Sequence, residues 1–148
     1  MRVRRVATSL CAGLVALGCG DDEAPKPDRE QVRDVVHAFF RDAADGDVEA
    51  VCGALTGVGR AQAAGRGQII GRPPVPVSEE RCIERDARTA TVSQDLPEVV
   101  DALRIERVRV HGRMATAYVC GGALCTPQTL RRTNPGWRVN SFQFPVND

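Results

Sequence analysis

The residues of this sequence best suited to chemistry are its six cysteines. They are Cys11, Cys19, Cys52, Cys82, Cys120 and Cys125. A structural zinc site needs four ligands, and no second close cysteine pair or histidine cluster completes the pair at positions 120 and 125. No two cysteines have the two-residue spacing of a redox-active motif. The spacing therefore predicts no metal and no other cofactor, and it favours structural disulfides.

The positions of four cysteines predict how they pair. Cys52 and Cys82 are expected on the apolar faces of two helices, and a bond between them would close a loop of 31 residues, worth roughly 3–4 kcal/mol by chain entropy. Cys120 and Cys125 flank four residues at the expected tip of a hairpin, where two strands approach as closely as a disulfide requires. Of the three pairings that four cysteines allow, we predict Cys52–Cys82 and Cys120–Cys125.

Groups suited to acid–base catalysis are few. His37 is expected on the polar face of a helix, and His111 is expected in a turn between two strands. Both side chains are therefore expected to be exposed to solvent and without a catalytic role. Glu106 is flanked by arginines, so a surface ion pair is favoured over a base with a perturbed pKa. Tyr118 is the only tyrosine, and it is expected in the core. The sequence predicts no catalytic residue.

The N-terminus predicts export. Three arginines in the first five residues precede eleven uncharged, mostly apolar residues at 7–17, and small residues follow. Eleven residues are too few to span a membrane, which needs about 20 in a helix. Gly18 and Cys19 resemble a bacterial lipobox, in which the cysteine becomes the first mature residue and carries acyl chains. Leu17 departs from that pattern, so plain cleavage before Cys19 stays open.

The cysteine count favours acylation. Removal of residues 1–18 takes Cys11 away, and acylation consumes Cys19, which leaves an even set of four for disulfides. The acidic, proline-containing segment 19–27 is expected to be a solvated tether on a cell-membrane lipid anchor, facing the extracytoplasmic side. Residues 28–148 are long enough for one domain. After removal of the signal, 17 basic residues face 19 acidic ones, which disfavours a nucleic-acid partner.

The hydrophobic periodicity predicts helices first and hairpins last. A first helix is expected from an N-cap and capping box at Asp28 to a stop at Gly46, a second from Asp47, and a third from Ser78. Residues 56–76 are expected to be a loop with a helical turn near 60–64. Four strands are expected within 104–121 and 126–144, with turns at His111–Gly112 and 134–136. The predicted class is α+β, with helices packed on one side of an antiparallel sheet.

The order of these elements resembles the nuclear-transport-factor-2-like (NTF2-like) superfamily, and more narrowly its bacterial lipoprotein, SnoaL-like members. The resemblance covers 28–144: a helix "QVRDVVHAFFRDAADGDVEAVCGAL", a third helix, and a meander ending "GWRVNSF". It implies a cone-shaped sheet that wraps one long helix and encloses an apolar pocket. The pocket residues then expected are Phe39, Phe40, Tyr118, Trp137 and Phe142.

These features predict a membrane-anchored, extracytoplasmic, non-enzymatic domain that binds an apolar small molecule or an envelope protein. Two alternatives remain open. One is an isomerase- or dehydratase-type enzyme that uses Tyr118 with an acid from a loop. The other is an interaction module that forms a homodimer through its open sheet face, which an exposed apolar face of several hundred Å² would favour.

Overall fold

The computed structural model describes residues 26–64, 75–89 and 100–144, with side chains from 86 to 89 left aside. The predicted signal peptide, Cys19 and nearly all of the predicted tether lie outside these residues. No helix in the described ranges is both long and apolar enough to cross a membrane.

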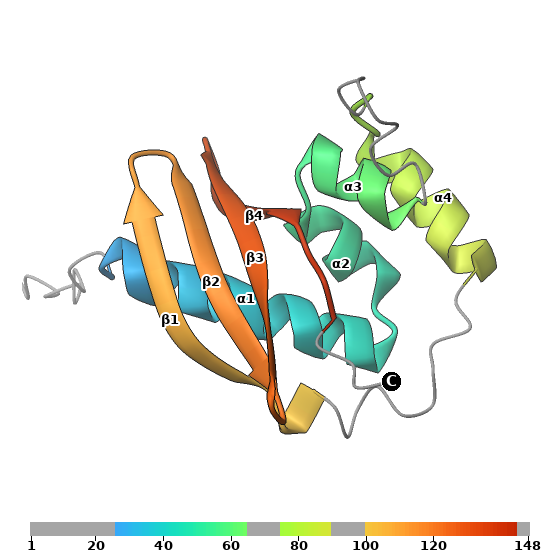
Figure 1. Ribbon diagram of the computed structural model, residues 1–148. Coiled ribbons are helices and arrows are strands. Elements are labelled where there is room, and N and C mark those ends of the chain that lie inside the picture. Colours follow the sequence, from blue (N-terminus) through green and yellow to red (C-terminus); the bar gives the residue numbers. More distant parts are fainter. Residues whose placement is uncertain (1–25, 65–74, 90–99, 145–148) are drawn as a thin grey trace, which may run out of the picture.

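Four helices precede four strands (Figure 1). The helices are α1 (Asp28–Asp45), α2 (Val48–Ala54), α3 (Gly57–Ala63) and α4 (Glu79–Thr89), and the strands are β1 (Arg104–His111), β2 (Met114–Gly121), β3 (Leu124–Thr133) and β4 (Gly136–Ser141). Helices first and strands last agrees with the prediction, which named three helices and left the segment of α3 as a loop with a helical turn. The strands form one antiparallel sheet in the order β1-β2-β3-β4. Helix α1 crosses one face of this sheet, and α2, α3 and α4 lie beyond its β4 edge. The α+β class and the turns predicted at His111–Gly112 and 134–136 are confirmed.

The residues that end α1 and begin α2 are those predicted from the sequence, whereas the predicted start of α1 needs a correction. Helix α1 stops at Gly46, whose φ of 72° is left-handed and therefore suits glycine. The side chain of Asp47 then caps α2 by accepting a hydrogen bond from the Ala50 amide at 3.0 Å. The predicted capping box at Asp28 is wrong, because Pro27 is the N-cap and makes no side-chain cap. The Asp28 carboxylate instead accepts from the Arg132 guanidinium at 2.9 Å.

Helix α3 lies where a loop with only a helical turn near 60–64 was predicted. Its N-cap is Thr56, whose hydroxyl accepts a hydrogen bond from the Gly59 amide at 3.1 Å. The glycines that weaken its local helix propensity have a tertiary role. A Cβ added at Gly59 would lie 2.7 Å from the carbonyl oxygen of Val139 on β4, so only a residue without a side chain lets α3 approach the strand this closely.

The two faces of the sheet differ sharply. Ala115, Ala117 and Val119 of β2 are buried against α1, while the alternate residues Thr116 and Tyr118 are half-buried on the opposite, outer face. Further buried positions complete the core under α1, among them Val32, Val36, Phe39, Phe40, Leu130, Trp137 and Val139. The buried side-chain amide of Gln128 holds the C-terminal segment in place. Its nitrogen donates to the backbone carbonyl of Gln143 at 2.8 Å, and its oxygen accepts from the backbone N–H of Gln143 at 2.9 Å.

Candidate functional site

Both predicted disulfides are present. Cys52–Cys82 joins α2 to α4 with a Cα–Cα distance of 5.9 Å, and Cys120–Cys125 closes the β2–β3 hairpin at 4.0 Å. Glu106 lies beside the second bond, so that its carboxylate and the two sulfurs fall within 4.8 Å of one another. Because both of these sulfurs are oxidised, they offer no thiolate to a metal ion. This cluster of the described residues is therefore a cross-link.

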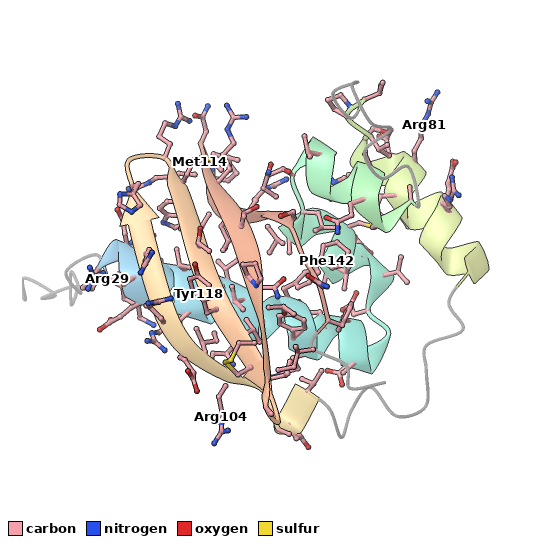
Figure 2. All side chains as sticks on the ribbon, in the orientation of Figure 1. Arg29, Arg81, Arg104, Met114, Tyr118 and Phe142 are labelled. Carbon is pink, nitrogen blue, oxygen red and sulfur yellow. A yellow bond between two sulfur atoms is a disulfide. The ribbon has the colours of Figure 1, made fainter. Side chains whose placement is uncertain are left out.

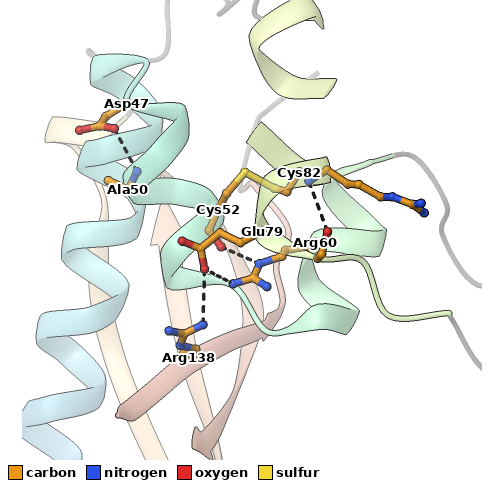
Figure 3. The surroundings of a disulfide bond; sticks show 9 residues. Asp47, Ala50, Cys52, Arg60, Glu79, Cys82 and Arg138 are labelled. Carbon is orange, nitrogen blue, oxygen red and sulfur yellow. Dashed lines mark hydrogen bonds and ion pairs between the residues drawn. A yellow bond between two sulfur atoms is a disulfide. The ribbon is translucent and has the colours of Figure 1, made fainter. Parts of the chain in front are cut away.

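A buried arginine lies under the Cys52–Cys82 bond (Figure 3). The Nε of Arg60 donates to the Cys52 carbonyl at 2.8 Å, and its terminal nitrogen donates to the Glu79 carboxylate at 2.7 Å. The same carboxylate oxygen lies 4.0 Å from Arg138 of β4. Burial lowers the pKa of the Arg60 guanidinium, while the Glu79 charge acts against that shift. Arg60 thus fastens α2 and α4 to α3, and sequence reasoning did not foresee this role.

Three of the residues predicted to line an apolar pocket pack against one another. Phe39 and Phe40 are 1% and 3% exposed, and the ring centroid of Phe39 lies 5.4 Å from that of Phe40 and 5.1 Å from that of Phe142. Phe144 closes the group against Phe40 at 5.3 Å. These edge-on and tilted contacts are typical of a packed aromatic core. The three predicted rings serve as core between α1 and the C-terminal segment.

The other two predicted pocket residues lie on opposite faces of the sheet. Trp137 is buried in the core beneath the sheet, and its indole N–H has no hydrogen-bond partner among the described residues. Tyr118 is on the outer face, with the guanidinium carbon of Arg107 4.5 Å from its ring centroid. The structure therefore does not gather the five residues around one cavity. The reason is that alternation along β2 turns the small residues, and not the tyrosine, toward α1.

An acid–base pair is missing from the described part of the chain. No carboxylate or histidine there hydrogen-bonds to the Tyr118 hydroxyl, and both His37 and His111 are exposed. The enzyme alternative required an acid from a loop, and the segments 65–74 and 90–99 lie outside the described residues. What the described residues do present is a charged surface.

The outer face of the sheet is basic. Between positions 104 and 141 the chain has seven arginines and a single acid, Glu106. Blue nitrogen atoms gather at the end of the sheet that carries Met114 (Figure 2). Among the described residues this face does not form the broad apolar surface that would favour dimerisation.

A pocket opens at this basic end, with a cavity volume of about 480 Å³. It lies between the β1–β2 turn, the β3–β4 turn and the start of α3, and we call it the arginine pocket. Its lining residues are Thr56, Gly57, Arg113, Arg131, Arg132, Thr133, Asn134, Pro135 and Arg138. Four of the nine are arginines and none is acidic, so the lining as a whole favours an anion.

The four guanidinium groups of the arginine pocket differ in whether they have a carboxylate partner. Arg132 pairs with Asp28 of α1 at 2.9 Å, and Arg138 has Glu79 at 4.0 Å. Within the described residues, the only hydrogen bond that the Arg113 guanidinium makes is to the backbone carbonyl of Arg132, at 3.2 Å. Arg131 is exposed and has no ion-pair or hydrogen-bond partner among the described residues. Two positive charges at the pocket thus lack a carboxylate partner.

This site was not predicted from the sequence, because only the nearly balanced charge of the mature chain, 17 basic against 19 acidic residues, was considered. That balance holds for the mature chain as a whole but not for its hairpins. The usable signal was the count within residues 104–141, where basic residues outnumber acids seven to one. Which of these arginines line one pocket depended on the face that each strand turns outward and on the approach of α3, and the sequence alone leaves both open.

Comparison with known proteins gives a distant likeness. No protein-family model matches the chain, and no curated protein matches it. Among solved structures, an NTF2-like protein with a cystatin-like fold from Novosphingobium aromaticivorans is 20% identical, with a TM-score of 0.43 over 77% of this chain and 78% of that one. A candidate dehydratase of the NTF2-like family from Streptomyces avermitilis is 18% identical, with a TM-score of 0.41 over 77% of this chain and 92% of that one.

Both descriptions name the superfamily that the order of elements resembles. At these TM-scores the likeness says nothing about activity or substrate. The function of this chain has to be argued from its own residues.

Proposed function

We propose that the protein is a non-enzymatic binding domain, held on the extracytoplasmic side of the membrane by acyl chains on Cys19. The observation that carries this proposal is the oxidised state of all four cysteines in the described residues. Disulfides of this kind persist in exported proteins and are rare in the cytosol. They therefore support the export that the N-terminal sequence predicts.

The pairing also supports acylation of Cys19. Once the predicted signal is removed, every other cysteine is in one of the two disulfides, so Cys19 would be left as the odd thiol of a secreted chain. Formation of a thioether with a lipid would consume the thiol of Cys19, so that no unpaired cysteine remains. The acidic residues that follow it suit a solvated tether between the membrane and α1.

Binding is favoured over catalysis by what the surface offers. The described residues present an arginine pocket without a paired acid and base, and general acid–base catalysis needs a group positioned to move a proton. The apolar ligand expected from the resemblance has little support, because its aromatic residues are packed as core. A charged ligand or a charged envelope partner fits the exposed surface better.

The test is a fractionation experiment on the full-length chain in a bacterial host. We expect the unmodified chain in the membrane fraction, with a mature mass that begins at Cys19 and includes acyl chains. Cys19→Ser is expected to lose both the membrane association and the added mass. Cys11→Ser, which lies in the predicted signal, is the matched control and is expected to change neither.

Thiol labelling tests the compartment at the same time. We expect no labelling at Cys52, Cys82, Cys120 and Cys125 before reduction and four labels after it. A mature chain without acyl mass, or thiols at these four positions that label freely in the intact cell, would contradict the proposal.

A further inference from the structure

We propose that the arginine pocket is a binding site for an oxyanion-bearing ligand, of the phosphate or carboxylate class, and that Arg113, Arg131 and Arg138 are its binding residues. This goes beyond the proposed function, which requires only that the domain binds something. It does not depend on the lipid anchor.

Strand register brings two of these residues together. Arg131 of β3 and Arg138 of β4 are directly opposite each other in the sheet, and both alternate with buried residues, so they share the outer face. Cross-strand partners have Cβ atoms about 4.5–5.5 Å apart, and like charges at that distance destabilise the pair. An anion between the two guanidinium groups would remove this repulsion.

The third arginine reaches the pocket from the neighbouring turn. Arg113 immediately precedes Met114, which is opposite Arg131 in the β2–β3 register. A backbone hydrogen bond of 2.8 Å from the Arg132 amide to the Arg113 carbonyl fixes this turn against β3. The three guanidinium groups are thus carried on hydrogen-bonded backbone, which limits the entropy lost on binding.

The nearby acids leave the pocket positive. Asp28 pairs with Arg132. Glu79 binds the buried Arg60 at 2.7 Å and lies farther from Arg138, at 4.0 Å. Arg113 and Arg131 therefore keep uncompensated charge, and no lining residue is acidic. A cation or a neutral apolar molecule would find no matching group there.

The chemistry of arginine and the size of the pocket narrow the ligand class. A guanidinium group presents a planar fork of donors that matches the two oxygens of a carboxylate or phosphate. The volume of about 480 Å³ lies in the range of about 300–1,000 Å³ typical of small-molecule sites. The ligand is therefore expected to be larger than a single phosphate and to carry more than one oxyanionic group. A soluble phosphate ester and an anionic lipid headgroup share this chemistry.

The test uses the full-length chain with Cys19→Ser, so that acylation contributes nothing to the readout. Inorganic pyrophosphate is titrated into the protein by calorimetry, in a buffer free of phosphate and sulfate. In parallel, vesicles of phosphatidylglycerol and of phosphatidylcholine are tested by co-sedimentation, with pyrophosphate as a competitor. The variants are Arg131→Gln and Arg113→Gln. Arg109→Gln, an exposed β1 arginine outside the pocket lining, is the matched control.

We expect saturable binding of pyrophosphate, of phosphatidylglycerol vesicles, or of both, that weakens about tenfold or more in Arg131→Gln and Arg113→Gln. Arg109→Gln is expected to bind as the parent does. Binding of pyrophosphate alone identifies a soluble ligand, whereas vesicle binding that pyrophosphate displaces identifies a headgroup.

Two results would overturn the proposal. The first is the absence of saturable binding to either probe. The second is an equal loss of affinity in Arg131→Gln, Arg113→Gln and Arg109→Gln. Such a result would mean that the anion is attracted by the overall positive charge of the sheet and not by the pocket. Thermal melts without anion provide an independent readout. Arg131→Gln is expected to melt at or above the parent temperature, because it removes a like-charge contact, so lost binding would not reflect lost folding.

Discussion

Removing the Cys52–Cys82 disulfide is expected to destabilise the domain more than removing Cys120–Cys125. The two bonds close loops of very different length, with sequence separations of 30 and 5. In the chain-entropy description, a cross-link stabilises the fold by restricting the unfolded chain, and this restriction grows with the logarithm of the loop length. For separations of 30 and 5 the expected contributions are about 3.6 and about 2 kcal/mol.

The assay is thermal unfolding of the parent chain and of the variants Cys52→Ala/Cys82→Ala and Cys120→Ala/Cys125→Ala. For a domain of this size, about 1 kcal/mol corresponds to about 4 °C in Tm, so the expected losses are about 14 °C and about 8 °C. Cys52 and Cys82 are 0% and 1% exposed, so replacing their sulfurs also leaves a small cavity. Reduction of the Cys120→Ala/Cys125→Ala variant breaks only the Cys52–Cys82 bond and keeps its sulfur atoms, so it isolates the effect of that cross-link.

Equal losses from the two bonds, or a larger loss from the shorter loop, would refute this reasoning. Such a result would place the stabilising effect in the folded hairpin and not in the unfolded chain. A reduced parent that is as stable as the oxidised one would refute it as well.

Two further predictions concern the core and the charge of α1. Phe39→Ala is expected to cost about 3–5 kcal/mol of unfolding free energy, whereas Tyr118→Ala, whose ring lies on the outer face under a guanidinium, is expected to cost about 1 kcal/mol. Equal costs in chemical denaturation would contradict the assignment of the two faces. Burial, helped by two nearby acids, Asp47 and Asp45, raises the pKa of Asp42 above its ordinary value of 3.8. The folded state thus holds this proton more tightly than the unfolded state, so stability falls as the pH rises from 3.8 through the raised folded pKa. Asp42 also lies in the last turn of α1, which contains no basic residue, and Asp42→Asn is expected to gain about 0.3–1 kcal/mol at pH 7. That gain should vanish once the pH is below the ordinary value, and a gain that persists there would count against this explanation.

Much of the fold followed from local signals in the sequence. The stop at Gly46, the cap at Asp47 and the hairpin turn after His111 each depend on residues within a few positions, and all three are present in the structure. The disulfide pairing was predictable for a related reason. Once Cys52 and Cys82 were assigned to apolar helix faces, burial of both faces brought the sulfurs together.

The predicted pocket could not be obtained in this way. The alternation along β2 separates Tyr118 from Ala117 and Val119 but does not say which set faces α1. That choice depends on which face α1 covers, and α1 covers the face of Ala115, Ala117 and Val119. Only a helical turn was predicted in place of helix α3, because its glycines are unfavourable for a helix locally and the close approach of Gly59 to β4 is a tertiary contact.

The sequence by itself determined that helices come first and hairpins last, where α1 stops and α2 begins, a correct choice of cysteine pairs, and the composition of the basic hairpins. Only the tertiary structure decided which face of the sheet is buried, how α3 meets β4, and which arginines share a pocket. The physical reason is the distance along the chain over which each interaction acts. Caps, turns and alternation arise from neighbours along the chain, whereas the packing of helices on the sheet joins residues that the sequence keeps far apart.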